Sequence, residues 1–219
     1  MDFFIDTANL DQIEEAQALG ILDGVTTNPS LMAKEGIYGE RKVQNHYKKI
    51  CELVEGPVSA EVLSTKKEEM IEEGIALFNL NPKQIVVKIP MTEDGLAAIK
   101  ALKEKNIPTN CTLVFSVSQA LMAAKVGATY VSPFVGRLDD ISSDGIALIN
   151  QIRIVFDNYH FDTQILAASI RHTKHIVDCA EIGADVVTAP LKVFKMLIKH
   201  PLTDIGLEKF LSDYNALKP

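Results

Sequence analysis

Short apolar runs alternate with longer amphipathic stretches along the whole chain. The clearest run is Ile85-Val86-Val87-Lys88-Ile89-Pro90, in which five of the six residues are apolar. Such a run predicts a strand buried on both faces, as in the parallel sheets of α/β proteins. The stretch after it has helical spacing, and Thr92 stands where a helix N-cap is expected. A buried parallel strand followed by a helix is therefore the first unit that the pattern predicts.

The same unit occurs eight times. Strands are predicted at residues 2–7, 24–28, 58–63, 85–90, 109–114, 129–135, 164–169 and 185–190. Each strand is followed by a predicted helix, and residues 203–217 form an extra amphipathic one. Eight units in series close a (β/α)₈ barrel, the TIM barrel of the α/β class. A doubly wound sheet is disfavoured because no Gly-rich nucleotide turn follows the first strand.

No linker or low-complexity tract divides the chain of 219 residues. We therefore expect one barrel domain over residues 1–219, with residues 201–219 as a C-terminal helical extension. The formal net charge of −7 argues against a general nucleic-acid surface. No apolar segment is long enough for a membrane helix, so no membrane partner is expected.

The cysteines indicate a reducing compartment. Cys51, Cys111 and Cys179 are odd in number, far apart, and include no CxxC pair, which is typical of unbridged thiols. The first residues carry no secretory signal pattern. We expect a cytoplasmic protein.

Lys88 is unusual because it stands in the middle of an apolar strand. A buried ammonium must find a partner, reach water, or give up its proton. A neutral lysine amine is the nucleophile that Schiff-base chemistry requires. Considered alone, Lys88 is explained more simply by an ion pair with a carboxylate.

Nearly every predicted strand carries a polar residue near its C-terminal end, where barrels place their active sites. These residues are Asp6, Thr26, Thr27, Asn28, Glu61, Lys88, Asn110, Thr112, Ser132, Arg137, Ser169 and Arg171. Each one has a structural explanation, such as a Glu61–Lys88 pair that only stabilises the fold. Because a barrel needs no such set to fold, the set as a whole favours an active site.

These residue types fit a lysine that attacks a ketone. Glu61, with Thr112 and a water, could move the protons of Schiff-base formation, and Asp6 could act as the base in retro-aldol cleavage. Arg137 and Arg171 are fork donors suited to a phosphate group. No metal or other cofactor is expected, because the iminium accepts the electrons. His172 and His175 are better explained as an exposed pair than as metal ligands.

Several motifs resemble the transaldolase family over essentially the whole chain. They are Asp6-Thr7-Ala8-Asn9, Gly24-Val25-Thr26-Thr27-Asn28-Pro29-Ser30, Val86-Val87-Lys88-Ile89-Pro90, Ser132-Pro133-Phe134-Val135-Gly136-Arg137 and Leu166-Ala167-Ala168-Ser169. The closest likeness is to its short microbial branch, which includes the fructose-6-phosphate aldolases. The resemblance implies a Schiff-base mechanism on a (β/α)₈ barrel, with Lys88 as the reactive lysine.

The resemblance also implies roles for the other polar residues. Asp6 corresponds to the general acid/base, and Glu61 and Thr112 to the pair that holds the catalytic water. The substrate-binding residues that we expect are Thr26, Asn28, Asn110, Ser132, Phe134, Arg137, Ser169 and Arg171. Within this set the asparagines correspond to ligands of the dihydroxyacetone unit, the arginines to phosphate ligands, and Phe134 to an aromatic wall.

Two of these positions favour a transaldolase over an aldolase. The aldolase relatives carry glutamine in place of Glu61 and tyrosine in place of Phe134. The predicted activity moves a dihydroxyacetone unit from fructose 6-phosphate or sedoheptulose 7-phosphate to an aldose phosphate. One alternative is an aldolase that releases free dihydroxyacetone. An alternative of another class is a non-covalent sugar-phosphate isomerase or binding barrel.

The family resemblance implies a homo-oligomer, a decamer, in which the C-terminal helix reaches a neighbouring subunit. Apolar positions at Ile205, Leu207, Phe210, Leu211 and Leu217 are compatible with such docking. The same helix could equally cover its own barrel, and the sequence leaves both arrangements open.

Overall fold

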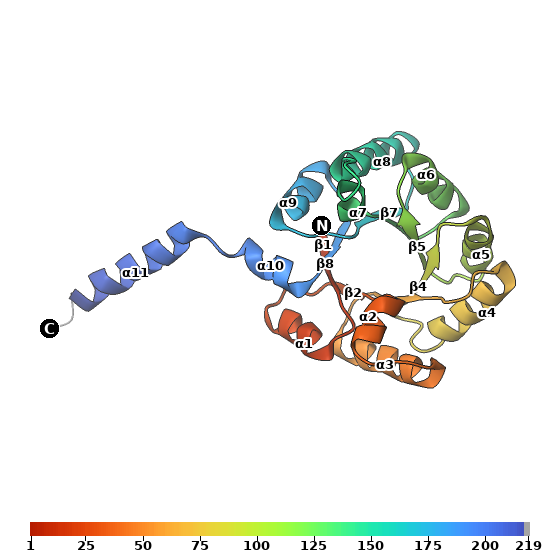
Figure 1. Cartoon of the computed structure of the whole chain (residues 1–219), viewed down its shortest axis with the longest axis horizontal. Coiled ribbons are helices and arrows are strands. Elements are labelled where there is room, and N and C mark those ends of the chain that lie inside the picture. The colour runs from red at the N-terminus through yellow and green to blue at the C-terminus, as the bar shows by residue number, and fades with distance from the viewer. Residues whose placement is uncertain (217–219) are drawn as a thin grey trace.

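Eight parallel strands close into a barrel in the computed structural model, which describes residues 1–216 (Figure 1). Each strand pairs with the next one along the chain, and β8 pairs with β1. The strands are β1 (Asp2–Asp6), β2 (Gly24–Thr26), β3 (Val58–Glu61), β4 (Ile85–Pro90), β5 (Thr109–Val114), β6 (Tyr130–Pro133), β7 (Gln164–Ala167) and β8 (Val186–Ala189). The predicted barrel is confirmed.

Most of the helices surround the strands on the outside of the barrel (Figure 1). The helices are α1 (Leu10–Ala18), α2 (Pro29–Lys34), α3 (Glu40–Leu53), α4 (Lys67–Phe78), α5 (Glu93–Lys103), α6 (Val117–Val126), α7 (Val135–Asp139), α8 (Gly145–Tyr159), α9 (Thr173–Ile182), α10 (Leu191–Leu197) and α11 (Pro201–Ala216). Thr92 caps α5 as predicted, because its hydroxyl accepts the Gly95 N–H.

The predicted strand over residues 129–135 starts one residue too early and ends two residues too late, and α7 was not predicted. The sixth strand ends at Pro133, and Phe134 keeps only an isolated bridge to Ala168. The chain then turns into α7, which carries Arg137. An apolar residue at position 135 continues the strand pattern in sequence, although it packs as part of a helix.

Mainly apolar side chains fill the barrel interior on the N-terminal side of the polar residues. Phe4, Val86, Tyr130, Leu166 and Val186 form a buried cluster of their own, separate from the larger core between the sheet and the helices. Because strand side chains alternate between faces, the residues two positions further on also point inward, one layer closer to the C-terminal ends. Lys88 is one of them.

The last helix, α11, projects away from the barrel (Figure 1). None of its residues is buried. The expectation that this helix covers its own barrel is therefore wrong. Leu217, one of the apolar positions considered above, lies outside the described residues. Within residues 1–216, no helix is long and apolar enough to span a membrane.

Candidate active site

The predicted site is a polar layer directly above the apolar layer of the barrel interior. Asp6, Lys88, Ser132 and Thr188 stand two residues after Phe4, Val86, Tyr130 and Val186, respectively. They therefore face the same interior, at the end of the strands where barrels carry their catalytic groups.

Lys88 is held from two sides. Its Nζ lies 3.0 Å from Glu61 Oε2 and donates to the Thr27 carbonyl oxygen at 3.0 Å. Glu61 and Lys88 are register partners on β3 and β4, so the pairing of these strands brings the charges together. Only 6% of Lys88 is exposed. The ion pair considered above as a structural alternative is thus present, and it also places a proton acceptor beside the amine.

Asn110 stands beside Lys88 in the register of β4 and β5. Its Oδ1 accepts a hydrogen bond of 2.8 Å from the Ser132 hydroxyl, and its Nδ2 donates to Ser59 Oγ at 3.2 Å. Ser59 was not predicted as a site residue. The signal was available, because Ser59 precedes Glu61 by two residues and must share its face.

Thr112 supplies a free hydroxyl near this group. Its Oγ1 is buried and has no hydrogen-bond partner within the described part of the chain. Buried hydroxyls are nearly always bonded, so an unsatisfied one marks a place for a water or a substrate group. The family resemblance assigns a water-holding role to this hydroxyl, and that role stays a prediction.

Asp6 lies at the end of β1. Thr26 Oγ1 donates to Asp6 Oδ1 at 2.8 Å and lies 2.6 Å from Thr188 Oγ1. Burial raises the pKa of Asp6 above its usual value, and the opposing effects of the Lys88 charge and the Thr26 hydrogen bond are smaller. A carboxyl with a raised pKa can both take and return a proton, as a general acid/base must. Thr188 was missed, although it is the inward polar residue of β8.

Asn28 has a structural contact as well as its predicted role. Its Oδ1 caps α2 by accepting the Leu31 N–H at 2.9 Å. The side-chain NH₂ group is therefore the part of Asn28 that can bond a substrate oxygen. Asp6 also borders a cleft of about 450 Å³, which is lined by residues of α1, α2 and α10.

We call the opening of the barrel at the C-terminal ends of the strands the mouth. Its rim is formed by Phe134 and the two arginines. The Phe134 ring meets Phe115 edge-on, with 5.5 Å between the ring centroids. The Arg137 guanidinium lies over the Phe134 ring, 5.6 Å from its centroid. Arg137 is exposed on α7, so its position is set by a helix that the sequence did not predict.

Arg171 is paired with a carboxylate. Both of its terminal nitrogens bond the two oxygens of Asp140, which lowers the pKa of Asp140. Gly136 makes room for this arrangement, because a Cβ there would meet Ser169 O at 2.4 Å and Arg171 Nε at 2.6 Å. Ser169 itself has a positive φ of 59° beside Arg171. Any anion that binds the Arg171 guanidinium must therefore share it with Asp140 or displace Asp140.

Comparison with known proteins agrees with this geometry. The sequence model of the transaldolase/fructose-6-phosphate aldolase family matches residues 3–218. The chain belongs to that family. A protein of Cytophaga hutchinsonii named "probable transaldolase" is 64% identical over 99% of both chains. Proteins of the same name from Phocaeicola vulgatus and Flavobacterium psychrophilum are 65% and 62% identical, over 99% and 98% of both chains. This likeness supports a transaldolase as the enzyme activity of the chain.

The two histidines lie next to Arg171, whose N–H donates to His175 Nδ1 at 3.4 Å. The expectation that both histidines are exposed is wrong for His175, which is buried and bonds Asp139 Oδ2 at 2.9 Å through Nε2. His172 caps α9 by accepting the His175 N–H. Within residues 1–216, no group of three or more His, Cys, Asp or Glu side chains has the arrangement of a metal site.

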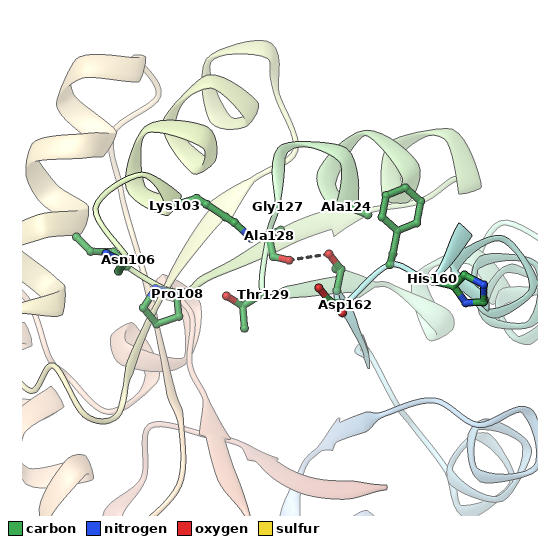
Figure 2. A pocket seen from close by; sticks show the side chains of 12 residues that line it. Lys103, Asn106, Pro108, Ala124, Gly127, Ala128, Thr129, His160 and Asp162 are labelled. Atoms are coloured by element: carbon green, nitrogen blue, oxygen red, sulfur yellow. Dashed lines mark hydrogen bonds between the residues drawn. The ribbon is translucent and has the colours of Figure 1, made fainter. Parts of the chain in front are cut away.

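A second cavity lies at the opposite end of the barrel (Figure 2). It has a volume of about 460 Å³ and is lined by the segments that precede β5, β6 and β7, including Lys103, Thr129 and Asp162. It contains none of the predicted site residues. Catalytic groups of barrels gather at the other end, so we do not assign this cavity to the transaldolase reaction.

Proposed function

We propose that the chain transfers a dihydroxyacetone unit from fructose 6-phosphate or sedoheptulose 7-phosphate to an aldose phosphate, through a Schiff base on Lys88. The supporting observation is the buried Lys88 amine, 3.0 Å from Glu61 and surrounded by the ends of the strands. A lysine that only stabilised the fold would not need a set of polar side chains around it at the strand ends.

The first step forms the Schiff base. Glu61 takes a proton from the Lys88 ammonium, and the neutral amine attacks the C2 carbonyl of the ketose phosphate. Loss of water from the carbinolamine leaves an iminium. Glu61 and a water on the Thr112 hydroxyl supply and remove the protons of this dehydration.

The second step breaks the carbon–carbon bond. Asp6 takes the proton of the C4 hydroxyl, the C3–C4 bond breaks, and its electron pair moves into the iminium to give an enamine on Lys88. The aldose phosphate leaves. The enamine then attacks the aldehyde of the acceptor, Asp6 returns the proton to the new hydroxyl, and water releases the ketose product.

Binding is divided between the inner part of the mouth, at the strand ends, and its rim. Asn28, Asn110, Ser132 and Thr26 surround the three-carbon unit, while Arg137 and Arg171 bind the phosphate of donor and acceptor. Ser169 supports the phosphate end through its contact with the Gly136–Arg171 region, and Phe134 forms the wall between the two parts.

The test compares fructose 6-phosphate with and without a four-carbon aldose phosphate as acceptor. By carbon count, transfer yields sedoheptulose 7-phosphate and a three-carbon aldose phosphate, with little free dihydroxyacetone when the acceptor is left out. Abundant free dihydroxyacetone would favour the aldolase. Binding without any product would favour the non-covalent barrel.

The assembly and location of the enzyme belong to the same proposal. We infer one barrel domain over residues 1–219 that forms a homo-oligomer, with residues 201–219 as an extension that packs on a neighbouring copy. The exposure of Leu202, Ile205 and Phe210 on α11 supports this, because apolar side chains seldom stay exposed in such number. A shorter chain that ends at residue 200 should then form an assembly with fewer subunits, as measured by light scattering. The unbridged buried cysteines support a cytoplasmic location.

A further inference from the structure

The pairing of β2 with β3 changes beside the reactive lysine. Thr27 N donates to Ser59 O at 3.3 Å, and the next bond of a regular parallel ladder would run from Glu61 N to Thr27 O. Glu61 N instead donates to the hydroxyl of Tyr47, at 3.3 Å. The Thr27 carbonyl oxygen accepts from Lys88 Nζ.

Tyr47 reaches this point from α3, outside the barrel. Only 2% of the residue is exposed, and its hydroxyl also lies 2.9 Å from Thr27 Oγ1. One phenol oxygen therefore bonds both Glu61 and Thr27, the two residues whose oxygens hold the Lys88 amine. Loss of this oxygen would disturb both of them at once.

The direction of these hydrogen bonds follows from counting protons. The Thr27 hydroxyl has one proton, which goes to the Ser59 carbonyl oxygen at 3.1 Å because that oxygen can only accept. Tyr47 must then donate to Thr27 and accept from Glu61 N–H. Burial raises the pKa of Tyr47 to about 12, so the phenol keeps its proton over the working range of an enzyme.

We propose that Tyr47 is a positioning residue for Lys88, because its hydroxyl takes the Glu61 N–H and leaves the Thr27 carbonyl free to hold the reactive amine. Without that hydroxyl, the Glu61 N–H and the Lys88 amine compete for one oxygen. The amine and its base, Glu61, then lose their fixed geometry. The inference rests on the proposed Schiff-base function of Lys88.

The test uses Tyr47→Phe, which keeps the ring and removes only the hydroxyl. The rate at which fructose 6-phosphate forms a borohydride-reducible adduct on Lys88 is measured in a single turnover. We expect this rate to fall roughly 10- to 100-fold, as for a misplaced reacting group, while KM changes much less.

The matched control is Thr163→Val. The Thr163 hydroxyl is also buried, and it donates to the Ala128 carbonyl oxygen at 2.7 Å in the lining of the cavity at the other end of the barrel. This variant should lower the thermal unfolding midpoint much as Tyr47→Phe does, with the adduct rate of the unchanged protein. Thr27→Val removes the hydroxyl that accepts the Tyr47 proton, and it should also lower the adduct rate.

Two results are distinguishable. An adduct on Lys88 that forms equally fast in Tyr47→Phe and in Thr163→Val overturns the role of Tyr47 and leaves the Schiff base intact. If the unchanged protein forms no adduct on Lys88, the proposed function fails and the positioning role fails with it.

Discussion

The inner part of the mouth and its rim are built in different ways. Lys88 is 6% exposed and is bonded to Glu61 on the adjacent strand and to the Thr27 carbonyl oxygen just after β2. Arg171 has a side chain that is 48% exposed, and its partner Asp140 is equally exposed. The inner groups are fixed by strand register, whereas the rim groups are long side chains on a short helix and a loop.

This difference separates the two tasks of the proposed reaction. Bond making and breaking requires atoms held at fixed distances, which buried register partners provide. Phosphate recognition tolerates more movement, because a guanidinium can follow a doubly charged group. Substitutions in the inner part should therefore lower kcat, and those of the charged rim residues should mainly change KM.

Lys88→Met should have the largest effect. It removes the nucleophile and keeps an apolar side chain of similar length, so kcat should fall by at least about 10⁴-fold. The measurement is the transfer rate, with fructose 6-phosphate binding followed by calorimetry. Transfer that survives this change would mean that Lys88 is only the ion-pair partner of Glu61.

Asp6→Asn should lower kcat by about 10²- to 10⁴-fold, as expected for loss of a general acid/base. The same change should raise stability. Because burial raises the pKa of Asp6, the carboxyl is neutral below that pKa and becomes an unfavourable buried charge above it. The unfolding midpoint of the variant should therefore exceed that of the unchanged protein by an amount that grows as the pH rises from the usual pKa of aspartate to the raised pKa of Asp6, and stays constant above it. A gain that shrinks with rising pH would contradict this assignment.

Arg171→Met should raise KM for phosphorylated donors by about 10- to 150-fold, the range for a lost hydrogen bond to a charged group, and change kcat little. The useful comparison is between two acceptors, one with a phosphate group and one without. KM for the acceptor without phosphate should be nearly unaffected, whereas KM for the phosphorylated acceptor should rise as it does for the donor. An equal loss with both acceptors would remove Arg171 from the phosphate site.

Phe134→Tyr tests the wall between the inner part and the rim. A hydroxyl there can protonate the enamine on Lys88, so free dihydroxyacetone should increase relative to transfer by about tenfold, less than a fully positioned acid provides. The partition is read from the product ratio at fixed acceptor concentration. An unchanged ratio would show that this ring does not decide between transfer and release.

Asp140→Asn should have the smallest effect. It weakens the carboxylate that competes with a phosphate for Arg171, so KM for phosphorylated donors should fall roughly two- to fivefold, in keeping with an exposed ion pair. Inhibition by inorganic phosphate should strengthen in parallel. A higher KM would mean that Asp140 orients Arg171 for the phosphate and does not compete with it.

The sequence predicted the inner part better than the rim. Alternation along each strand was sufficient to place Lys88, Glu61 and Asn110 on the inner face, and the same rule would have found Ser59 and Thr188. The family resemblance added the roles. Strand register then brings these residues together without further information, because a parallel barrel of eight strands leaves little freedom.

The remaining features depend on contacts that a linear pattern does not contain. The Arg171–Asp140 pair joins two loops 31 residues apart. The first residue of α7 continues an apolar run that predicts a strand. In the structure the strand ends before this residue, because Phe134 makes only an isolated bridge to Ala168. Tyr47 acts from a helix through a hydrogen bond that replaces part of a sheet ladder, so its position in α3 gave no signal.

The most direct test of the account is the intact mass of the protein after borohydride reduction with fructose 6-phosphate and no acceptor, followed by peptide mapping. We expect a reduced three-carbon adduct on the peptide that contains Lys88, with little free dihydroxyacetone. Sugar-phosphate binding without any adduct on Lys88 would contradict the covalent mechanism and favour the non-covalent barrel.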